Sequence, residues 1–558
     1  MNSADGAAGN MDEGAREGAA RPGVPAARRP RYGLPCVLIS GWALLIALCA
    51  LAYRGPAPRG EDAPPDEFSA ARAVATLRRV LGDEVPHPVG SEANGVVRER
   101  LVAELESLGL EVELHRTEAY RGDDEDAAVI PLTNVLARFP RASSAGQPLL
   151  LVTHHDSSPY APGAGDAGSG MAALLETARA LRGTPLPRPV YLLFTDGEEY
   201  GLLGAQRFVA EHPLMAERPF VLNFDARGDS GASLMYETHS ANRSWVAWAA
   251  SRLPRPCGTG SAFVTVYRLL PNNTDFTHFA AAGLQGANFA NIGSVHRYHT
   301  PLDTIANLDP RTVQHHGENA LTLTRELLHE APEAFADEED AVFFDVVGQW
   351  IVWYPNAWAI WLAVAPFLVL SVGQFLRWRD PQARGSSGRV VLAAGLTVAW
   401  SYGLGMLLGM GASQALIDAR ATLADMPAIA WTVFFMVLVW ITSIGGTVWL
   451  AGSLLRRAAA LDVWWTVWCG WSAVALLTAA WLPGFSHYVT WPAMAAALVS
   501  WHPHVRVRVA APVLVAGVLL VPLLYLLPIA LTVRAGAVLA TVATLAITSY
   551  WPVLADRP

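Results

Sequence analysis

The sequence contains no lysine and only four cysteines among its 558 residues. All 40 of its basic side chains are therefore arginines, and 49 acidic side chains bring the formal net charge to −9. An acidic chain gives no reason to expect nucleic acid as a partner, since such proteins need a basic patch. Three of the cysteines lie in apolar stretches, so neither a disulfide framework nor a cysteine-based zinc site can be built.

Charge in general is scarce, and hydrophobic residues are abundant. Charged residues make up 16% of the chain and hydrophobic ones 52%, a balance that departs from that of ordinary soluble proteins. The 20 tryptophans agree with this, because Trp concentrates at membrane–water interfaces. The composition therefore predicts a membrane protein, and its length predicts more than one domain.

The amino-terminal region predicts a tail followed by an anchor. Residues 1–32 are rich in Gly, Ala, Pro and Arg without apolar periodicity, which predicts a disordered cytoplasmic tail. Residues 33–53 are almost wholly apolar and long enough to cross a bilayer as a transmembrane anchor. Arg28, Arg29 and Arg31 precede this segment and hold the tail in the cytoplasm under the positive-inside rule. A cleaved signal peptide is the alternative, although the apolar segment is long for one.

A Pro- and Gly-rich linker is expected over residues 54–66, and a folded domain over residues 67–330. In this domain short apolar runs alternate with amphipathic ones. The expected strands lie at 134–137, 149–153, 190–195 and 220–224, and the expected helices at 170–181, 201–210 and 310–328. Such alternation predicts an α/β fold, with a mixed, mainly parallel sheet sandwiched by helices.

After a second linker at 331–346, residues 347–558 are expected to form an all-α polytopic membrane domain of about seven spans. The apolar runs lie at 350–376, 390–416, 428–455, 463–482, 488–501, 509–532 and 536–554. Arginine clusters fall in alternate loops, which places the folded domain on the extracytoplasmic side, periplasmic in a bacterium or lumenal in a eukaryote. The run at 488–501 is short and could instead be re-entrant or interfacial.

Two candidate site residues end the expected strand at 149–153. His154 and Asp156 are two positions apart, so they are expected to point to the same side. Asp156 could orient a metal-bound imidazole, as carboxylates commonly do. Taken alone, the pair is better explained as an ordinary His–Asp contact at a strand end.

Three further carboxylates follow in glycine-rich surroundings. Asp166 lies in the loop PGAGDAGSG, where it could bridge two cations or, with Ser169, simply cap the next helix. Glu198 and Glu199 follow the strand at 190–195, so one could bind metal while the other accepts a proton from water. A solvated acidic first turn of a helix is the alternative for this pair.

The last candidates complete a two-metal set. Asp225 ends the run at 220–224, and His299 stands in RYHTPLDT with Asp303 as a possible support or helix cap. His154, Asp225 and Asp166 would hold one ion, and Glu199, His299 and Asp166 the other, which leaves open positions for water. The sequence therefore predicts a hydrolytic site with two Zn²⁺ ions and Glu198 as general base.

The order of these motifs resembles a known family. H-x-D, G-A-x-D-x-x-S-G, E-E-x-G-L-x-G, D and Y-H-T-x-x-D-T recur in this order in the di-zinc exopeptidases, which include leucyl aminopeptidases and glutamate carboxypeptidases. The resemblance implies the zinc exopeptidase fold, the metal ligands His154, Asp166, Glu199, Asp225 and His299, and the base Glu198. It also implies that Tyr298 stabilises the oxyanion, as in some relatives.

An anchor, this domain and a polytopic tail together resemble the membrane branch of endoplasmic-reticulum metallopeptidase and vacuolar membrane protease. The resemblance implies a membrane-anchored aminopeptidase with a peptide substrate. Ala167 and Gly168 depart from the residues that many relatives have there. Two alternatives stay open, a glutaminyl-cyclase-like acyltransferase and a non-catalytic receptor or scaffold. The sequence predicts neither peptide specificity nor oligomeric state.

Overall fold

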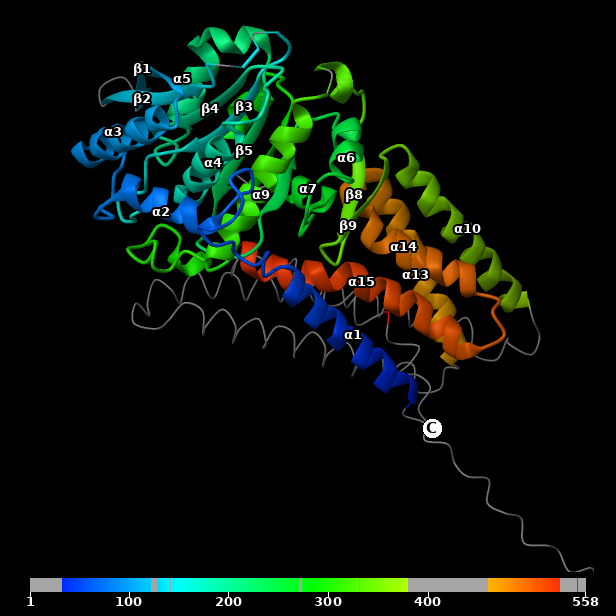
Figure 1. Cartoon of the computed structure of the whole chain (residues 1–558). Coiled ribbons are helices and arrows are strands. Elements are labelled where there is room, and N and C mark those ends of the chain that lie inside the picture. The colour runs from blue at the N-terminus through cyan, green and yellow to red at the C-terminus, as the bar shows by residue number, and fades with distance from the viewer. Residues whose placement is uncertain are drawn as a thin grey trace, which may run out of the picture.

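The computed structural model describes residues 33–121, 128–140, 142–143, 145–269, 273–330, 332–379, 460–531 and 549. An α/β domain occupies one end of the molecule, and long apolar helices lie beneath and beside it (Figure 1). The predictions for residues 1–32 and for the apolar runs at 390–416 and 428–455 concern residues outside the described ones, as does nearly all of the prediction for 536–554.

The α/β domain is built on a seven-stranded sheet with the order β1-β2-β4-β3-β5-β7-β6. Its four inner strands β4, β3, β5 and β7 are mutually parallel, whereas β2 and β6 run antiparallel to their neighbours. The strands are β1 Glu111–Arg121, β2 Ala128–Arg138, β3 Leu149–His154, β4 Val190–Thr195, β5 Phe220–Ala226, β6 Leu234–Thr238 and β7 Gly286–Asn291. The prediction of a mixed, mainly parallel sheet is confirmed.

The sheet is covered by helices on both faces, as predicted. Helices α2 (Ala70–Leu81), α4 (Gly168–Leu181) and α9 (Pro310–Leu327) pack together on one face, and α5 (Leu203–Glu211) and α8 (Asp275–Ala281) on the other. Every residue of β3 and β5 is buried, because a parallel strand covered on both faces has no solvent side. The remaining helices of the domain are α3 Glu92–Ser107, α6 Arg243–Ala249 and α7 Ser261–Leu269, with 3-10 turns at Pro213–Glu217, Val295–Arg297 and Pro332–Phe335.

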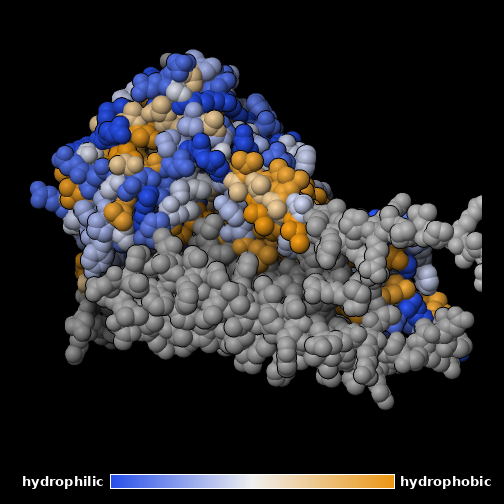
Figure 2. Space-filling view, turned by 90° about the horizontal axis from the view of Figure 1, so that it is seen from below, coloured by the Kyte–Doolittle hydropathy of each residue, from blue (hydrophilic) through white to orange (hydrophobic). Residues whose placement is uncertain are grey.

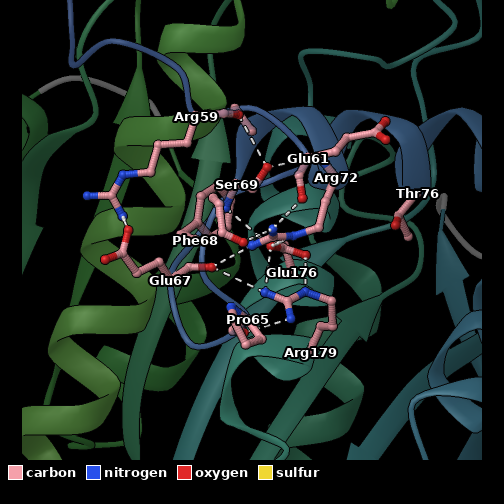
Figure 3. A network of polar contacts seen from close by, with 12 residues as sticks. Arg59, Glu61, Pro65, Glu67, Phe68, Ser69, Arg72, Thr76, Glu176 and Arg179 are labelled. Atoms are coloured by element: carbon pink, nitrogen blue, oxygen red, sulfur yellow. Dashed lines mark hydrogen bonds and ion pairs between the residues drawn. The ribbon is translucent and has the colours of Figure 1, made fainter.

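The segment at 54–66 contains no helix or strand, but it is fastened to the domain (Figure 3). Its anchor point is the buried carboxylate of Glu176 on α4, which accepts hydrogen bonds from Arg72 Nε at 2.9 Å and Arg179 Nε at 2.7 Å. The Arg72 guanidinium in turn donates to the carbonyl oxygens of Glu61 and Ala63. The segment is therefore a strap held in one conformation rather than a free connection.

The predicted linker at 331–346 is wrong in its second half. Residues Ala341–Val346 form strand β8, which pairs with β9 (Trp350–Pro355) in an antiparallel hairpin through a turn at Val347 and Gly348. The apolar run that was expected to open the first span therefore begins as a strand. Its helix α10 starts only at Trp358, because the residues before it pair as this hairpin, in which β8 is buried except at Val346 and β9 buries Ile351 and Tyr354.

Five long apolar helices are described outside the α/β domain: α1 Gly33–Ala52, α10 Trp358–Arg379, α13 Ala460–Trp481, α14 Pro483–Val499 and α15 Val505–Leu531. Within the described residues, three helical segments are long and apolar enough to cross a membrane, namely Trp358–Arg379, Leu461–Trp481 and Val505–Leu526. Seen from below, a large hydrophobic area lies near the middle of the described surface, with smaller hydrophobic areas elsewhere among hydrophilic side chains (Figure 2). The count of about seven spans after the anchor stays a prediction.

Candidate metal centre

The candidate site residues gather at the carboxyl-terminal ends of the parallel strands. His154 is the last residue of β3, Asp225 lies near the end of β5, and Glu198 and Glu199 follow β4 within four residues. His299 comes from the loop after β7. Because these strands are parallel and adjacent, their ends meet at one edge of the sheet, where α/β proteins place ligands.

Asp166 lies at the centre of this group and faces two histidines. Its Oδ1 is 3.1 Å from His154 Nε2, and its Oδ2 is 3.1 Å from His299 Nε2. Asp225 Oδ1 lies 3.5 Å from the same nitrogen of His154, and Glu199 Oε2 lies 2.8 Å from that of His299. Two triplets result, each with its ligand atoms within 4.8 Å of one another, and Asp166 belongs to both.

Asp166 does not cap helix α4, which was the alternative role for this residue. The residue that caps α4 is Ala167, and no side chain donates or accepts a capping hydrogen bond there. Ser169 instead donates its hydroxyl proton to the carbonyl oxygen of Gly165 at 2.7 Å. The Asp166 carboxylate is thus free of a capping role and points into the cluster.

The electrostatics of the cluster suit a cation. Burial, together with the nearby Asp166 charge, raises the pKa of Glu199 to about 7, and burial likewise raises the pKa of Asp225. Burial alone would raise the pKa of Asp166 too, but hydrogen bonds from His154 and His299 hold it below its usual range. Negative charges brought this close in a buried site repel one another unless positive charge lies between them.

The donor set also fits a metal ion chemically. The buried Oε1 of Glu199 has no hydrogen-bond partner, although buried polar atoms are rarely left unpaired. Two imidazoles and three carboxylates are the nitrogen and oxygen ligands that zinc sites use. The residues present therefore fit one or two divalent ions, since the ligand atoms of each triplet already lie close together.

Asp156 is placed differently from the expectation that its carboxylate orients His154. The backbone carbonyl oxygen of Asp156 lies 2.9 Å from His154 Nδ1, whereas its carboxylate is 3.6 Å away. The carboxylate instead accepts the backbone N–H groups of Glu198 at 3.1 Å and Glu199 at 3.3 Å. One residue thus orients the histidine through its backbone and holds the two glutamates through its side chain.

Glu198 and Tyr298 lie beside the cluster without belonging to either triplet. Burial and then the neighbouring Asp225 charge raise the pKa of Glu198 well above its usual value. The Tyr298 ring stacks on His299 with 3.7 Å between ring centroids. Burial followed by the charge of Asp166 raises the pKa of the Tyr298 phenol, so its hydroxyl keeps its proton.

Two buried acids support the site. Asp303, whose role the sequence left open, accepts the N–H of Gly165 on one oxygen at 2.6 Å and that of Asp166 on the other at 3.2 Å. Asp275 is not among the predicted site residues, because it opens the short helix α8, 50 residues after Asp225 and 24 before His299, outside every motif. It accepts a hydrogen bond from Thr195, and burial raises its pKa to about 7.

Comparison with known proteins finds similarity to one family of peptidases. Residues 134–324 match the model of Peptidase family M28. The vacuolar membrane protease of Eremothecium gossypii is 28% identical over 55% of this chain and 32% of its own length. The putative endoplasmic reticulum metallopeptidase 1 of Schizosaccharomyces pombe is 28% identical over 66% of this chain and 48% of its own. This chain thus spans less than half the length of either relative.

Solved structures match the α/β domain at low identity. A glutaminyl cyclase from Porphyromonas gingivalis is 22% identical with a TM-score of 0.38, over 47% of this chain and 99% of that one. The zinc aminopeptidase BSAP from Bacillus subtilis is 15% identical with a TM-score of 0.36, over 48% of this chain and 99% of that one. The side-chain cluster from His154 to His299 lies wholly inside residues 134–324, the part of the chain that matches the model of Peptidase family M28.

Proposed function

We propose that this chain is a membrane-anchored, zinc-dependent exopeptidase of the aminopeptidase type that hydrolyses peptides on the extracytoplasmic side. The observation that carries the proposal is the position of Asp166, whose two carboxylate oxygens face two different histidines. A carboxylate shared in this way is what a pair of metal ions requires. The family match and the names of the relatives, a membrane protease and metallopeptidases, support peptide hydrolysis.

His154, Asp166 and Asp225 would hold one Zn²⁺, and Asp166, Glu199 and His299 the other. When bound, the two ions supply Lewis acidity that polarises the peptide carbonyl and makes water a stronger acid. Glu198 accepts a proton from the attacking water and delivers it to the departing amine as the C–N bond breaks. Its raised pKa suits this exchange at neutral pH, since a carboxyl group of ordinary acidity would release the proton poorly.

Asp156 and Tyr298 assist the reaction without binding a metal ion. The hydrogen bonds from the backbone of Glu198 and Glu199 to Asp156 keep the base and the adjacent ligand at a constant separation. Tyr298 keeps its phenolic proton and stacks on His299, so its hydroxyl can donate a hydrogen bond to the oxygen of the carbonyl under attack.

The test uses the purified full-length chain with aminoacyl anilides and short peptides. We expect turnover, about two zinc ions per chain by elemental analysis, loss of activity on chelation and recovery with Zn²⁺. Glu198→Gln should lower turnover by roughly 10²- to 10⁴-fold while the metal content is kept. Glu211→Gln, an exchange of a glutamate exposed on α5, is the matched control and should leave activity unchanged.

Three results would contradict the proposal in different ways. Full turnover by Glu198→Gln would remove the proposed base. A chain that binds no zinc would favour the non-catalytic receptor or scaffold. Cyclisation of peptides with amino-terminal glutamine, without hydrolysis of any peptide bond, would favour the glutaminyl-cyclase-like alternative.

A further inference from the structure

The edge of the sheet that holds the candidate metal centre is also the edge that packs on membrane helices. Loop residues Ala232 and Ile292 and the β6 residue Leu234 form one apolar cluster with side chains of α1 and α15. That cluster includes Cys49 and Tyr53 at the end of α1, and Val521 and Leu526 on α15. Figure 1 shows α1 and α15 running up to the underside of the domain, near α9.

The contact at this edge is close. Gly258 has φ +59°, and a Cβ there would lie 2.5 Å from a Leu234 side-chain carbon and 2.9 Å from one of Leu526. The positive φ favours glycine, and a larger residue here would have to push the two leucine side chains aside. Leu526 lies five residues before the end of α15 at Leu531. The domain therefore packs directly on the carboxyl-terminal part of this helix.

The candidate metal centre lies a short chain distance from this contact. Asp225 is seven positions before Ala232, and His299 is seven positions after Ile292. A residue extends the chain by at most about 3.6 Å, so the ligands lie no more than about 25 Å from the apolar cluster. The actual separation is much shorter at Asp225, because His316 Nδ1 lies 2.6 Å from Ser233 Oγ and His316 Nε2 lies 3.0 Å from the Asp225 carbonyl oxygen. One imidazole ring therefore separates this candidate ligand from the loop that packs on α1 and α15.

Several contacts fix this orientation. The Tyr53 hydroxyl at the end of α1 donates to Asp345 Oδ2 of β8 at 3.0 Å. Ser261 at the start of α7 donates its hydroxyl proton to the carbonyl oxygen of Gly484 on α14 at 2.9 Å. The strap at 54–66 is tied to α4 through the Glu176 network (Figure 3). The domain is therefore held against the helices at separate points and cannot turn its site away.

The loops around the site carry exposed apolar side chains. Tyr160, Tyr200 and Leu302 are 72%, 44% and 53% exposed, and each lies within six residues of a candidate ligand. Tyr160 belongs to the loop that holds Asp166, Tyr200 follows Glu199, and Leu302 follows His299. An apolar rim of this kind suits contact with apolar chain segments or with the lipid interface.

We propose that the substrates of this site are peptides anchored in the same bilayer, whose free amino-terminal ends stand a short distance above the membrane surface. The proposal rests on the proposed function and names its substrate class. A membrane-proximal, fixed site with an apolar rim would meet such a tail at high effective concentration. A soluble peptide gains nothing from this arrangement.

The test measures cleavage of anchored peptides as a function of spacer length. The full-length chain is reconstituted in vesicles with a reporter peptide joined to an acyl anchor through flexible Gly-Ser spacers of 4, 8, 12, 20 and 30 residues. We expect kcat/KM for spacers of about 8 to 12 residues to exceed that of the unanchored peptide at least tenfold. The rate should fall for longer spacers, because effective concentration falls once the spacer exceeds the span.

Two outcomes overturn the proposal while peptide hydrolysis stands. One is cleavage only with spacers of about 20 residues or more, which would place the site far from the bilayer. The other is equal kcat/KM for free and anchored peptides at every length. If neither kind of peptide is cleaved, the proposed function itself fails. Glu198→Gln in the same vesicles is the background control, and a soluble protease added from outside checks that all anchored peptides are equally accessible.

Discussion

The carboxylate of Asp303 lies across the backbone of Asp166 and accepts its N–H at 3.2 Å. Its other oxygen accepts the N–H of the preceding glycine at 2.6 Å. The carbonyl oxygen of Asp303 also accepts the N–H of Ala164 at 3.2 Å. The loop that presents the proposed bridging ligand is thus held by a single residue more than 130 positions away.

We expect Asp303→Ala to lower metal affinity by about 10- to 100-fold, because residues that orient metal ligands commonly contribute this much. The measurement is titration of the metal-free protein with Zn²⁺ against a competing chelator. Asp309→Ala is the matched control, since Asp309 accepts the N–H of Arg311 at the start of α9 and touches no candidate ligand. Equal loss of affinity in both variants would show that Asp303 acts only through general stability.

Asp156 gives a graded prediction. Asp156→Asn keeps one oxygen that can accept from Glu198 or Glu199, whereas Asp156→Ala keeps none. We expect kcat to fall in both and further in the Ala variant, because the proton-accepting Glu198 loses its fixed position. Steady-state kinetics with zinc analysis of the same samples checks this. A drop in zinc content that accounts for the whole loss would assign Asp156 to metal retention instead.

Removal of the Glu176 carboxylate should destabilise the domain. Glu176→Leu would leave the guanidinium groups of Arg72 and Arg179 without their shared partner in a part-buried position. Breaking such a pair costs roughly 3 kcal/mol, so the midpoint of thermal unfolding should fall by several degrees. The matched control is Glu104→Leu, whose partner Arg79 lies mostly exposed and whose ion pair should contribute less than about 1 kcal/mol. An equal fall in both would contradict the account of the strap.

A fourth prediction concerns the loss of folding stability at acidic pH. Burial lowers the pKa of His315 on α9 from 6.5 to about 3, and the ring is kept neutral between the N–H of Ser233 and the carbonyl oxygen of Arg255. Because the folded pKa lies below the unfolded one, this contribution to stability is complete above pH 6.5 and is lost as the pH falls from about 6.5 toward 3.

His315→Gln retains a donor and an acceptor but cannot titrate. We therefore expect wild type to be more stable at pH 7.5 and the difference in melting temperature to narrow by pH 5. Thermal unfolding of both proteins across this range measures the difference. A gap that is constant with pH would show that His315 does not change its protonation on unfolding.

Local pattern was enough for much of the site and part of the fold. The apolar runs at 149–153, 190–195 and 220–224 predicted the central strands, because fully buried parallel strands have a short, continuous apolar signature. The polar residues directly after these runs indicated which edge of the sheet carries the candidate site. The pairing of Asp303 with Asp166 and the part played by Asp275 could not be read, since both depend on contacts between distant segments.

The class of chemistry and the presence of membrane segments can be predicted from the sequence alone, because both follow from which residue types stand at which spacing. The folded structure was needed to show that Asp156 holds the two glutamates through its carboxylate, that residues 341–346 form a strand, and that the edge with the candidate metal ligands packs on α1 and α15. Hydrogen-bond partners and packing neighbours far apart in the chain are set by how the sheet edge, loops and helices come together in space. The periodicity of the sequence does not show which distant segments come into contact.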